Sequence, residues 1–421
     1  MKHNKTGSGN SLWTRDFTII TVGSIVSMLG NSMAGFALSL MVLDYTGSNM
    51  LYAIYLMTYT VPQLIVPIFS GALLDRFSRK KMIYTLDFTI SVIYLLLGFL
   101  LFQGWFNFPL FALFSLIIGS IGSVYMVAYD SFYPMLITKG NYSKAYSIAS
   151  VLETFAIFIV PVATFFYKLF GMGPLLFVNA GLFFVAAVLE TQIRAEEKYI
   201  EEQKESIKGE DLSKISRVLI DIKEGFKYLY SEKGLLAIAI YFFFSALAGG
   251  AAEVICLPYY KDNFNNGEYI YMMVYGCSFL GRAIGGTFNY KKNLKAASRY
   301  KIAIFVYIII GLFEGLYLYV PVKVAMMLAL CVGMGGVTSY TIRVSSTQSY
   351  VPDEKKGRFN GAFQVLSTSG TLAAELLAGV LTLHMDQRAV MLLFNLTAVA
   401  AAIVIIGGNK KKVMKIYNRS I

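Results

Sequence analysis

Six ionisable side chains interrupt the longest apolar stretches of this 421-residue chain, and their chemistry calls for an explanation. They are Glu153, Glu253, Arg282, Glu314, Arg343 and Glu375. A charge inside a hydrocarbon layer is costly, so such a residue indicates by default an ion pair, a proton carrier or a ligand contact. At a helical rise of about 1.5 Å per residue, Glu375 and Glu314 fall near the middle of their runs. We expect Glu375 first, and Glu314 second, to bind and release a proton.

The elements that must position these side chains are membrane-spanning helices. Of all residues, 56% are hydrophobic and 15% are charged, whereas soluble domains carry roughly a quarter of charged residues. Crossing a bilayer takes about 20 apolar residues. Runs of that size lie at 17–43, 49–72, 82–103, 108–130, 145–168, 174–191, 234–259, 269–290, 300–320, 324–350, 359–383 and 388–407. The sequence therefore predicts an all-α membrane protein with six spans on each side of one long loop.

The distribution of lysine and arginine predicts the orientation. Most of the 37 basic residues lie in both tails, in the loop at 192–232 and in alternate short loops. Because cytoplasmic loops are enriched in lysine and arginine, both termini and the long loop are expected in the cytoplasm. This asymmetry accounts for the net charge of +12, and nucleic-acid binding is not needed to explain it. We expect a multi-pass protein of the cell membrane.

Five segments follow from these patterns. They are a tail at 1–16, a first bundle at 17–191, a linker at 192–232, a second bundle at 233–407 and a basic tail at 408–421. Within the linker, apolar residues recur at helical spacing over 213–231, which predicts an amphipathic helix on the membrane surface or the base of a bundle.

Metal and enzyme chemistry find little support in the sequence. The three cysteines lie in apolar segments without a metal-binding spacing, and the two histidines are far apart. The Gly-x-x-x-x-Gly-Lys-[Ser/Thr] pattern of an ATP-binding loop is absent, as is a nucleophile elbow. We therefore expect no cofactor, no metal and no enzymatic activity.

One short loop carries the most specific motif of the chain. Gly71, Asp75, Arg76, Arg79 and Lys80 fit the pattern G-x-x-x-D-R-x-x-R-K between the second and third runs. This loop resembles the signature of the major facilitator superfamily. The resemblance implies twelve transmembrane helices in two pseudo-symmetric six-helix bundles, and secondary transport by alternating access around a site near the midplane.

A faint internal repeat agrees with that resemblance. The segment 139–146, Lys-Gly-Asn-Tyr-Ser-Lys-Ala-Tyr, aligns with 356–363, Lys-Gly-Arg-Phe-Asn-Gly-Ala-Phe, and both copies lie between the fourth and fifth spans of their own half. The signature loop has a second, degenerate copy in which Asn289 stands where Asp75 stands in the first.

The resemblance also implies roles for the loop and for a buried pair. In the family, the aspartate at the position of Asp75 lies near the start of the eleventh helix, and a signature arginine pairs with an acid at the place of Asp130. These contacts would gate the closed inner face. The fifth and eighth helices of the family face each other, so Glu153 and Arg282 are expected to pair, with a structural or gating role, and direct coupling remains an alternative.

The remaining candidates are expected to line a central cavity. The second helix lines this cavity in the family, which makes Tyr55 and Tyr59 candidates. Glu253 lies toward the outer end of its run and fits either the vestibule or the rim. Arg343 and Gln348 belong to an unusually polar tenth run.

The segment 351–358, Val-Pro-Asp-Glu-Lys-Lys-Gly-Arg, is similar to a stretch of bacterial macrolide and siderophore exporters. The resemblance implies proton-coupled export of a lipophilic or amphipathic small molecule, as in drug efflux and antibiotic resistance, by a monomer. One departure is that Val160-Pro161-Val162 lacks the flanking glycines of drug antiporters. Two alternatives stay open: uptake of a nutrient such as a sugar, peptide or organic acid, and a membrane sensor that transports nothing.

Overall fold

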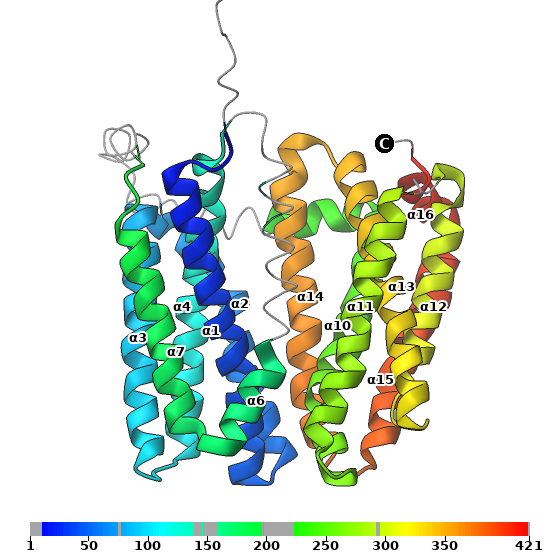
Figure 1. The fold of residues 1–421 in the computed structure, drawn as a ribbon. Coiled ribbons are helices and arrows are strands. Elements are labelled where there is room, and N and C mark those ends of the chain that lie inside the picture. Colours follow the sequence, from blue (N-terminus) through cyan, green and yellow to red (C-terminus); the bar gives the residue numbers. More distant parts are fainter. Residues whose placement is uncertain are drawn as a thin grey trace, which may run out of the picture. The chain divides into compact units, whose positions relative to one another are not determined.

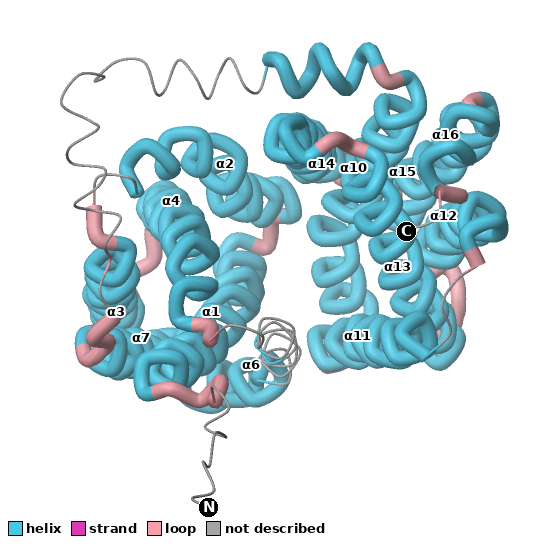
Figure 2. Tube along the Cα trace, turned by 90° about the horizontal axis from the view of Figure 1, so that it is seen from above, coloured by secondary structure: helices cyan, strands magenta, loops and turns pink. Residues whose placement is uncertain are grey.

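The computed structural model describes residues 11–74, 77–138, 145, 148, 159–195, 197, 223–291 and 295–419. Within these ranges the chain forms helices and no strands. By their contacts the residues divide into two units, one made of Met1–Tyr45 and Ile65–Ile215 and the other of Thr46–Leu64 and Ser216–Ile421. The first half of α2 thus belongs to the second unit. Figures 1 and 2 show the helices of each unit from two directions.

The helices of the first part of the chain are long and follow the apolar runs. They are α1 (Arg15–Thr46), α2 (Asn49–Leu74), α3 (Arg79–Phe102), α4 (Phe108–Phe132), the 3₁₀ turn η1 (Tyr133–Leu136), α6 (Ile159–Phe170) and α7 (Met172–Thr191). Turns between them use glycine at positive φ, at Gly47, Gly104 and Gly171. A residue without a Cβ adopts this backbone conformation without strain, so the chain reverses tightly at these points.

The second part of the chain forms α10 (Lys233–Asn263), α11 (Gly267–Lys291), η2 (Ala296–Ser298), α12 (Arg299–Gly315), α13 (Val322–Tyr350), α14 (Asp353–Leu381) and α15 (Gln387–Ala401). A π-helical turn, η3 (Ala402–Gly407), and the short α16 (Lys410–Tyr417) follow. The hydroxyls of Tyr307 and Tyr417 lie 2.7 Å apart, so α16 packs against α12.

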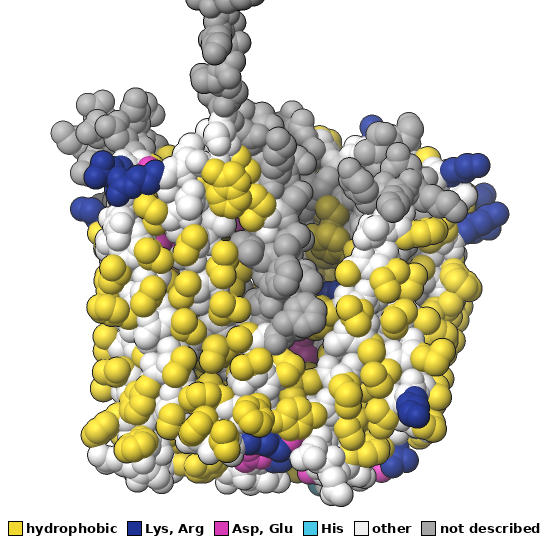
Figure 3. Space-filling model, viewed as in Figure 1, with side chains coloured by type: hydrophobic (Ala, Val, Ile, Leu, Met, Phe, Trp, Pro, Cys, Tyr) yellow, Lys and Arg dark blue, Asp and Glu magenta, His cyan; other side chains and the backbone are white. Residues whose placement is uncertain are grey.

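Nine helices of the described residues are long and apolar enough to cross a membrane. On the face shown in Figure 3, hydrophobic side chains cover the flanks of the helices and most lysines and arginines lie near helix ends. This pattern suits helices whose flanks meet lipid and whose ends meet water. The prediction of an all-α membrane fold is confirmed.

Glycines allow close helix packing in both units. A Cβ on Gly98 of α3 would lie 2.9 Å from the ring of Phe177 on α7, and one on Gly333 of α13 would lie 1.9 Å from the carbonyl oxygen of Ser278 on α11. Small residues at such crossings let helix backbones approach each other where lipid provides no hydrophobic drive.

A helix at 223–231 packs against other helices of the second unit, and we call it the linker helix. Its Leu229 is 1% exposed in a core shared with Phe359 of α14. Glu224 forms an ion pair of 2.6 Å with Arg358, whose side chain is 44% exposed against 47% for Glu224. A Cβ on Gly225 would lie 2.2 Å from the carbonyl oxygen of Arg358. The linker helix lies within the stretch 213–231, and the earlier part of that stretch falls outside the described residues.

Candidate functional site

Among the predicted site residues that the structure describes, Glu375 is the most deeply buried. Its side chain is fully buried on α14 (0% exposed). Oε1 accepts a hydrogen bond of 2.9 Å from the hydroxyl of Thr60 on α2, and Oε2 has no hydrogen-bond partner. A carboxyl group in this position is costly when charged and unpaired, and cheap when it carries a proton.

The first half of α2 packs against the part of α14 that carries Glu375, within the second unit. Gly379 lies one turn after Glu375. A Cβ at this position would lie 2.7 Å from Cβ of Ala53, so the absence of a side chain lets α2 and α14 pack closely. Tyr52 is 4% exposed, and its hydroxyl donates to the backbone carbonyl of Glu253 on α10 at 3.3 Å. The site is therefore assembled from three helices, α2, α10 and α14.

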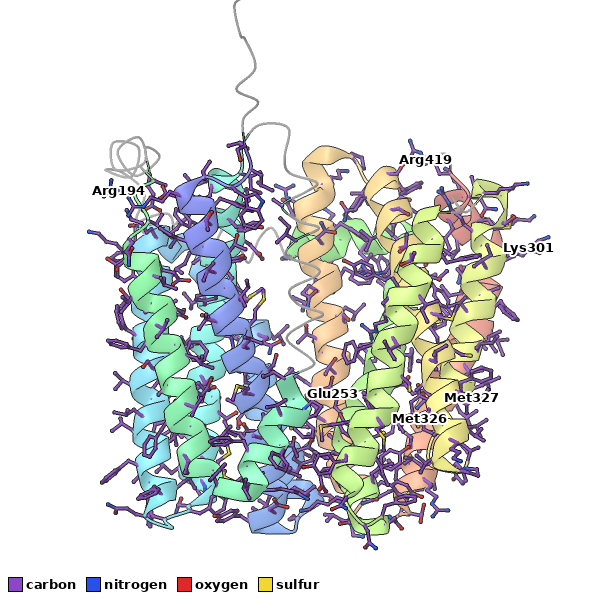
Figure 4. The ribbon with its side chains drawn as sticks, viewed as in Figure 1. Arg194, Glu253, Lys301, Met326, Met327 and Arg419 are labelled. Atoms are coloured by element: carbon purple, nitrogen blue, oxygen red, sulfur yellow. The ribbon has the colours of Figure 1, made fainter. Side chains whose placement is uncertain are left out.

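A second carboxyl group, that of Glu253, belongs to the same neighbourhood. Its side chain is exposed on α10 and lies within electrostatic range of both Glu375 and Glu314. Figure 4 places Glu253 between the helix ends of the second unit, away from the end that carries Lys301 and Arg419. Two acidic side chains, one buried and one accessible, thus lie near each other, which is an arrangement that can pass a proton inward.

Glu314 has a different partner. It lies on α12 within electrostatic range of Arg282 on α11. The Arg282 guanidinium also lies 5.6 Å from the ring centroid of Phe279. A nearby cation favours the ionised carboxylate, so this pair suits a structural ionic contact. Glu153, the partner predicted for Arg282, lies outside the described residues.

Arg343 of α13 is surrounded by aromatic rings. Its guanidinium carbon lies 4.6 Å from the ring centroid of Phe363 on α14, 5.1 Å from that of Phe242 on α10 and 5.3 Å from that of Tyr340. A guanidinium is attracted to the faces of aromatic rings, and this contact joins three helices. Five residues later, Gln348 donates to Asn360 of α14 at 2.7 Å.

The two tyrosines predicted for the cavity differ in their surroundings. Tyr55 is 7% exposed, whereas Tyr59, one turn later on α2, is 43% exposed. The hydroxyl of Thr58 donates to the backbone carbonyl of Tyr55 at 2.7 Å. Their role in a cavity stays a prediction.

The signature loop ends at the start of α3, where the backbone is capped. Ser78 is the N-cap and accepts from the amide of Lys81. The Glu197 carboxylate accepts from the Ser78 hydroxyl and from the amides of Arg79, at 2.8 Å, and Lys80, at 3.3 Å. A carboxylate is stabilised at a helix N-terminus because the first amides point toward it. The sequence offered no sign that Glu197 would serve this role.

The side chains of the motif point to neighbouring helix ends. The Arg79 guanidinium donates to the backbone carbonyl of Ser131 at 3.2 Å, next to Asp130 at the end of α4. The Lys80 ammonium donates to the carbonyl of Ile193 at 3.2 Å. Gly71 lies within α2, and Asp75 and Arg76 fall outside the described residues. The gating role of the loop stays a prediction.

Two buried acids were missed in the sequence. Asp87 of α3 is 1% exposed and Glu190 of α7 is 0% exposed. Both lie inside predicted spans, at 82–103 and 174–191, but near their ends, where a charge is readily assigned to the membrane boundary. The signal that the sequence offered was that each acid falls inside a predicted span. No group of three or more His, Cys, Asp or Glu side chains able to hold a metal ion occurs among the described residues.

The sequence matches the family model of the Major Facilitator Superfamily over residues 20–375. The chain is 24% identical over 336 residues to the uncharacterized MFS-type transporter YkuC of Bacillus subtilis, covering 76% of this chain and 75% of YkuC. It is 23% identical over 295 residues to macrolide efflux protein A of Streptococcus pyogenes, covering 67% of this chain and 69% of that protein.

Solved structures show the same fold. The crystal structure of the nucleoside transporter NupG superposes with a TM-score of 0.68 at 12% sequence identity, covering 93% of this chain and 98% of NupG. At that identity the likeness concerns the fold alone. With the family match over most of its length, the chain belongs to the Major Facilitator Superfamily and is a transporter of that superfamily.

Proposed function

We propose that the protein exports a lipophilic or amphipathic small molecule in exchange for protons, with Glu375 as the proton carrier. The observation that carries this proposal is the buried Glu375 carboxyl group, bonded to Thr60 through one oxygen and without a partner at the other. A carboxyl group held in this way can gain a proton without breaking a contact. When it loses the proton, the charged carboxylate needs water or another hydrogen-bond donor.

Export is supported by the similarity to macrolide efflux protein A and by the aromatic surroundings of the site. Tyr52 and Tyr55 are buried, Tyr52 lies within electrostatic range of Glu375, and the ring centroids of Tyr271 and Tyr275 on α11 lie 4.4 Å apart. Aromatic surfaces of this kind bind apolar molecules without strict demands on their shape. A monomer with both termini in the cytoplasm completes the proposal.

Inverted membrane vesicles with an acidic interior test this function. Wild-type vesicles should accumulate a fluorescent lipophilic substrate or a labelled macrolide, and dissipating the pH gradient should abolish the accumulation. Glu375→Gln should reduce gradient-driven accumulation to the level of vesicles without the protein, because an amide does not bind and release a proton in this pH range. Exchange of labelled for unlabelled substrate at equal pH should continue in this variant, since exchange requires no proton release.

Glu314→Gln is the matched control because Glu314 is a half-buried carboxyl group of the same unit with a cation nearby. Accumulation in this variant should remain within about twofold of wild type, the range expected when no proton carrier is lost. Equal losses in Glu314→Gln and Glu375→Gln would contradict the assignment of the proton to Glu375.

Uptake of an organic anion is the second candidate function, and Arg343 favours it. Among the described residues, its guanidinium contacts aromatic rings and no carboxylate, so an anionic ligand could pair with it. Right-side-out vesicles separate the two functions. Accumulation of an organic anion in these vesicles, lost in Arg343→Gln and retained in Glu375→Gln, would replace export by uptake. A sensor would move neither class of compound.

A further inference from the structure

Among its described residues, the first unit contains two buried carboxyl groups that the proposed function does not use. Asp87 lies on α3, two turns from its start, and Ser27 of α1 donates a hydrogen bond of 2.8 Å to its Oδ2. Glu190 lies at the end of α7, and neither of its oxygens makes a well-formed hydrogen bond. Both side chains are at most 1% exposed. These two residues are called the acidic pair.

Gly23 of α1 leaves room for the acidic pair because glycine has no side chain. A Cβ on Gly23 would lie 2.9 Å from Oε1 and 3.1 Å from Cγ of Glu190. Ser27 follows Gly23 by one turn, so one face of α1 contacts both acids. The Glu190 carboxyl group is therefore held inside the helix packing and does not extend to the surface.

In the part of the first unit that the structure describes, the groups that face the acidic pair carry no positive charge. The carboxyl groups of Asp87 and Glu190 lie within electrostatic range of each other. From α4, Tyr125 approaches both acids and Tyr129 approaches Glu190, and α1 adds only the hydroxyls of Ser24 and Ser27. The basic side chain of Lys80 is directed to the carbonyl of Ile193. Among the described residues, no lysine, arginine or histidine interacts with either acid.

Two carboxylates so placed cannot both remain charged without a large cost. Desolvation and mutual repulsion each disfavour the second charge, and close carboxyl pairs resolve this by retaining one proton. A proton on one carboxylate oxygen turns that oxygen from an acceptor into an O–H donor, which can bond to a neighbouring oxygen atom.

We propose that Asp87 and Glu190 form a proton-binding site within the first unit, in which the two carboxyl groups share one proton near neutral pH. The site is carried by α1, α3, α4 and α7 and does not involve Glu375. It does not depend on the proposed direction or substrate of transport, because its occupancy is a property of the folded protein alone.

Infrared spectroscopy of the purified full-length protein tests the site without any substrate. The comparison is made in a Glu375→Gln background, which removes the signal of that carboxyl group. Adding Asp87→Asn and Glu190→Gln together should remove one band of a protonated carboxyl group at neutral pH. Ser27→Ala, which leaves both acids in place, should retain this band with a shifted frequency. Identical carboxyl bands with and without the two substitutions would overturn the proposal.

Thermal unfolding provides a second measurement. The folded pair holds a proton that the unfolded chain gives up above a pH of about 4, so the wild-type Tm should fall as the pH rises from there toward neutral pH. Glu190→Gln, which is close in shape, should flatten this dependence. A Tm that rises on replacing choline chloride by sodium chloride, in wild type and not in Glu190→Gln, would indicate a sodium site and refute the shared proton.

Discussion

The two units bury acidic side chains in different ways. In the second unit, Glu314 lies near the cation of Arg282 and Glu375 accepts a hydrogen bond from Thr60. In the first unit, the hydroxyl of Ser27 donates to Asp87 and the hydroxyl of Tyr125 lies near Glu190, whereas no basic side chain among the described residues interacts with the acidic pair. The difference teaches that burial by itself does not define a role, because the neighbours of a carboxyl group decide whether it holds a charge or a proton.

The largest effect in this comparison is expected from Gly23→Ala. The new Cβ would lie 2.9 Å from the Glu190 carboxylate, so the acid must move within packed helices, at a cost of about 1–3 kcal/mol in unfolding free energy. Unfolding in mixed micelles measures it. Gly35→Ala on the same helix is the control, since nothing lies within 4 Å of its Cβ. Similar losses in both variants would show that the fit between Gly23 and Glu190 is unimportant.

A smaller loss is expected when the hydroxyl donor of each buried acid is removed. Ser27→Ala leaves Asp87 without its bond of 2.8 Å, and a buried acceptor without a partner costs about 1–2 kcal/mol. Thr60→Val does the same for Glu375. The two variants should lose similar unfolding free energy, but only Thr60→Val should slow gradient-driven transport. A transport defect of equal size in Ser27→Ala would assign the acidic pair to the coupling step.

Arg282→Ala tests the ionic partner of Glu314. Because the Arg282 side chain is exposed, the loss should stay near the surface-pair range of about 0.5–1 kcal/mol. The double variant Arg282→Ala/Glu314→Gln should recover part of the loss, since it removes the charge left behind. If the two substitutions are simply additive in unfolding free energy, Arg282 and Glu314 do not interact.

Tyr52→Phe should have the smallest effect. It deletes a hydrogen bond of 3.3 Å to the carbonyl of Glu253 and leaves the ring in place, so we expect a loss of about 0.5 kcal/mol. The Tm of the purified variant measures it. A fall in Tm as large as that of Thr60→Val would mean that α2 is held mainly by Tyr52.

The helices could be predicted closely because apolar runs set their length. The run at 234–259 corresponds to α10 at Lys233–Asn263, and the run at 324–350 to α13 at Val322–Tyr350. α14 begins at Asp353, six residues before its predicted run, because its first turns are polar and hydropathy does not register them. The π-helical turn at Ala402–Gly407 left no signal that hydropathy could register.

The site could be predicted only in part because partners lie far apart in sequence. Glu375 stood out as an acid in the middle of an apolar run, but its partner Thr60 lies 315 positions away on another helix. Glu153 was predicted as the partner of Arg282 from the resemblance to the family and lies outside the described residues, so this pair stays a prediction. The sequence did not indicate that Glu314 would lie within electrostatic range of Arg282. Depth along a helix does not reveal which direction a side chain faces. The acidic pair was missed because both acids lie near the ends of their predicted spans, and because their contacts with Gly23 and Ser27 come from another helix.

The attachment of the linker helix to α14 combines two contacts that respond differently to ionic strength. The ion pair between Glu224 and Arg358 is nearly half exposed, so dissolved salt screens it. The fit of Gly225 against the Arg358 backbone involves no charge and is unaffected by counter-ions. Concentrated salt should therefore weaken the hold of the linker helix without changing the position at which it rests.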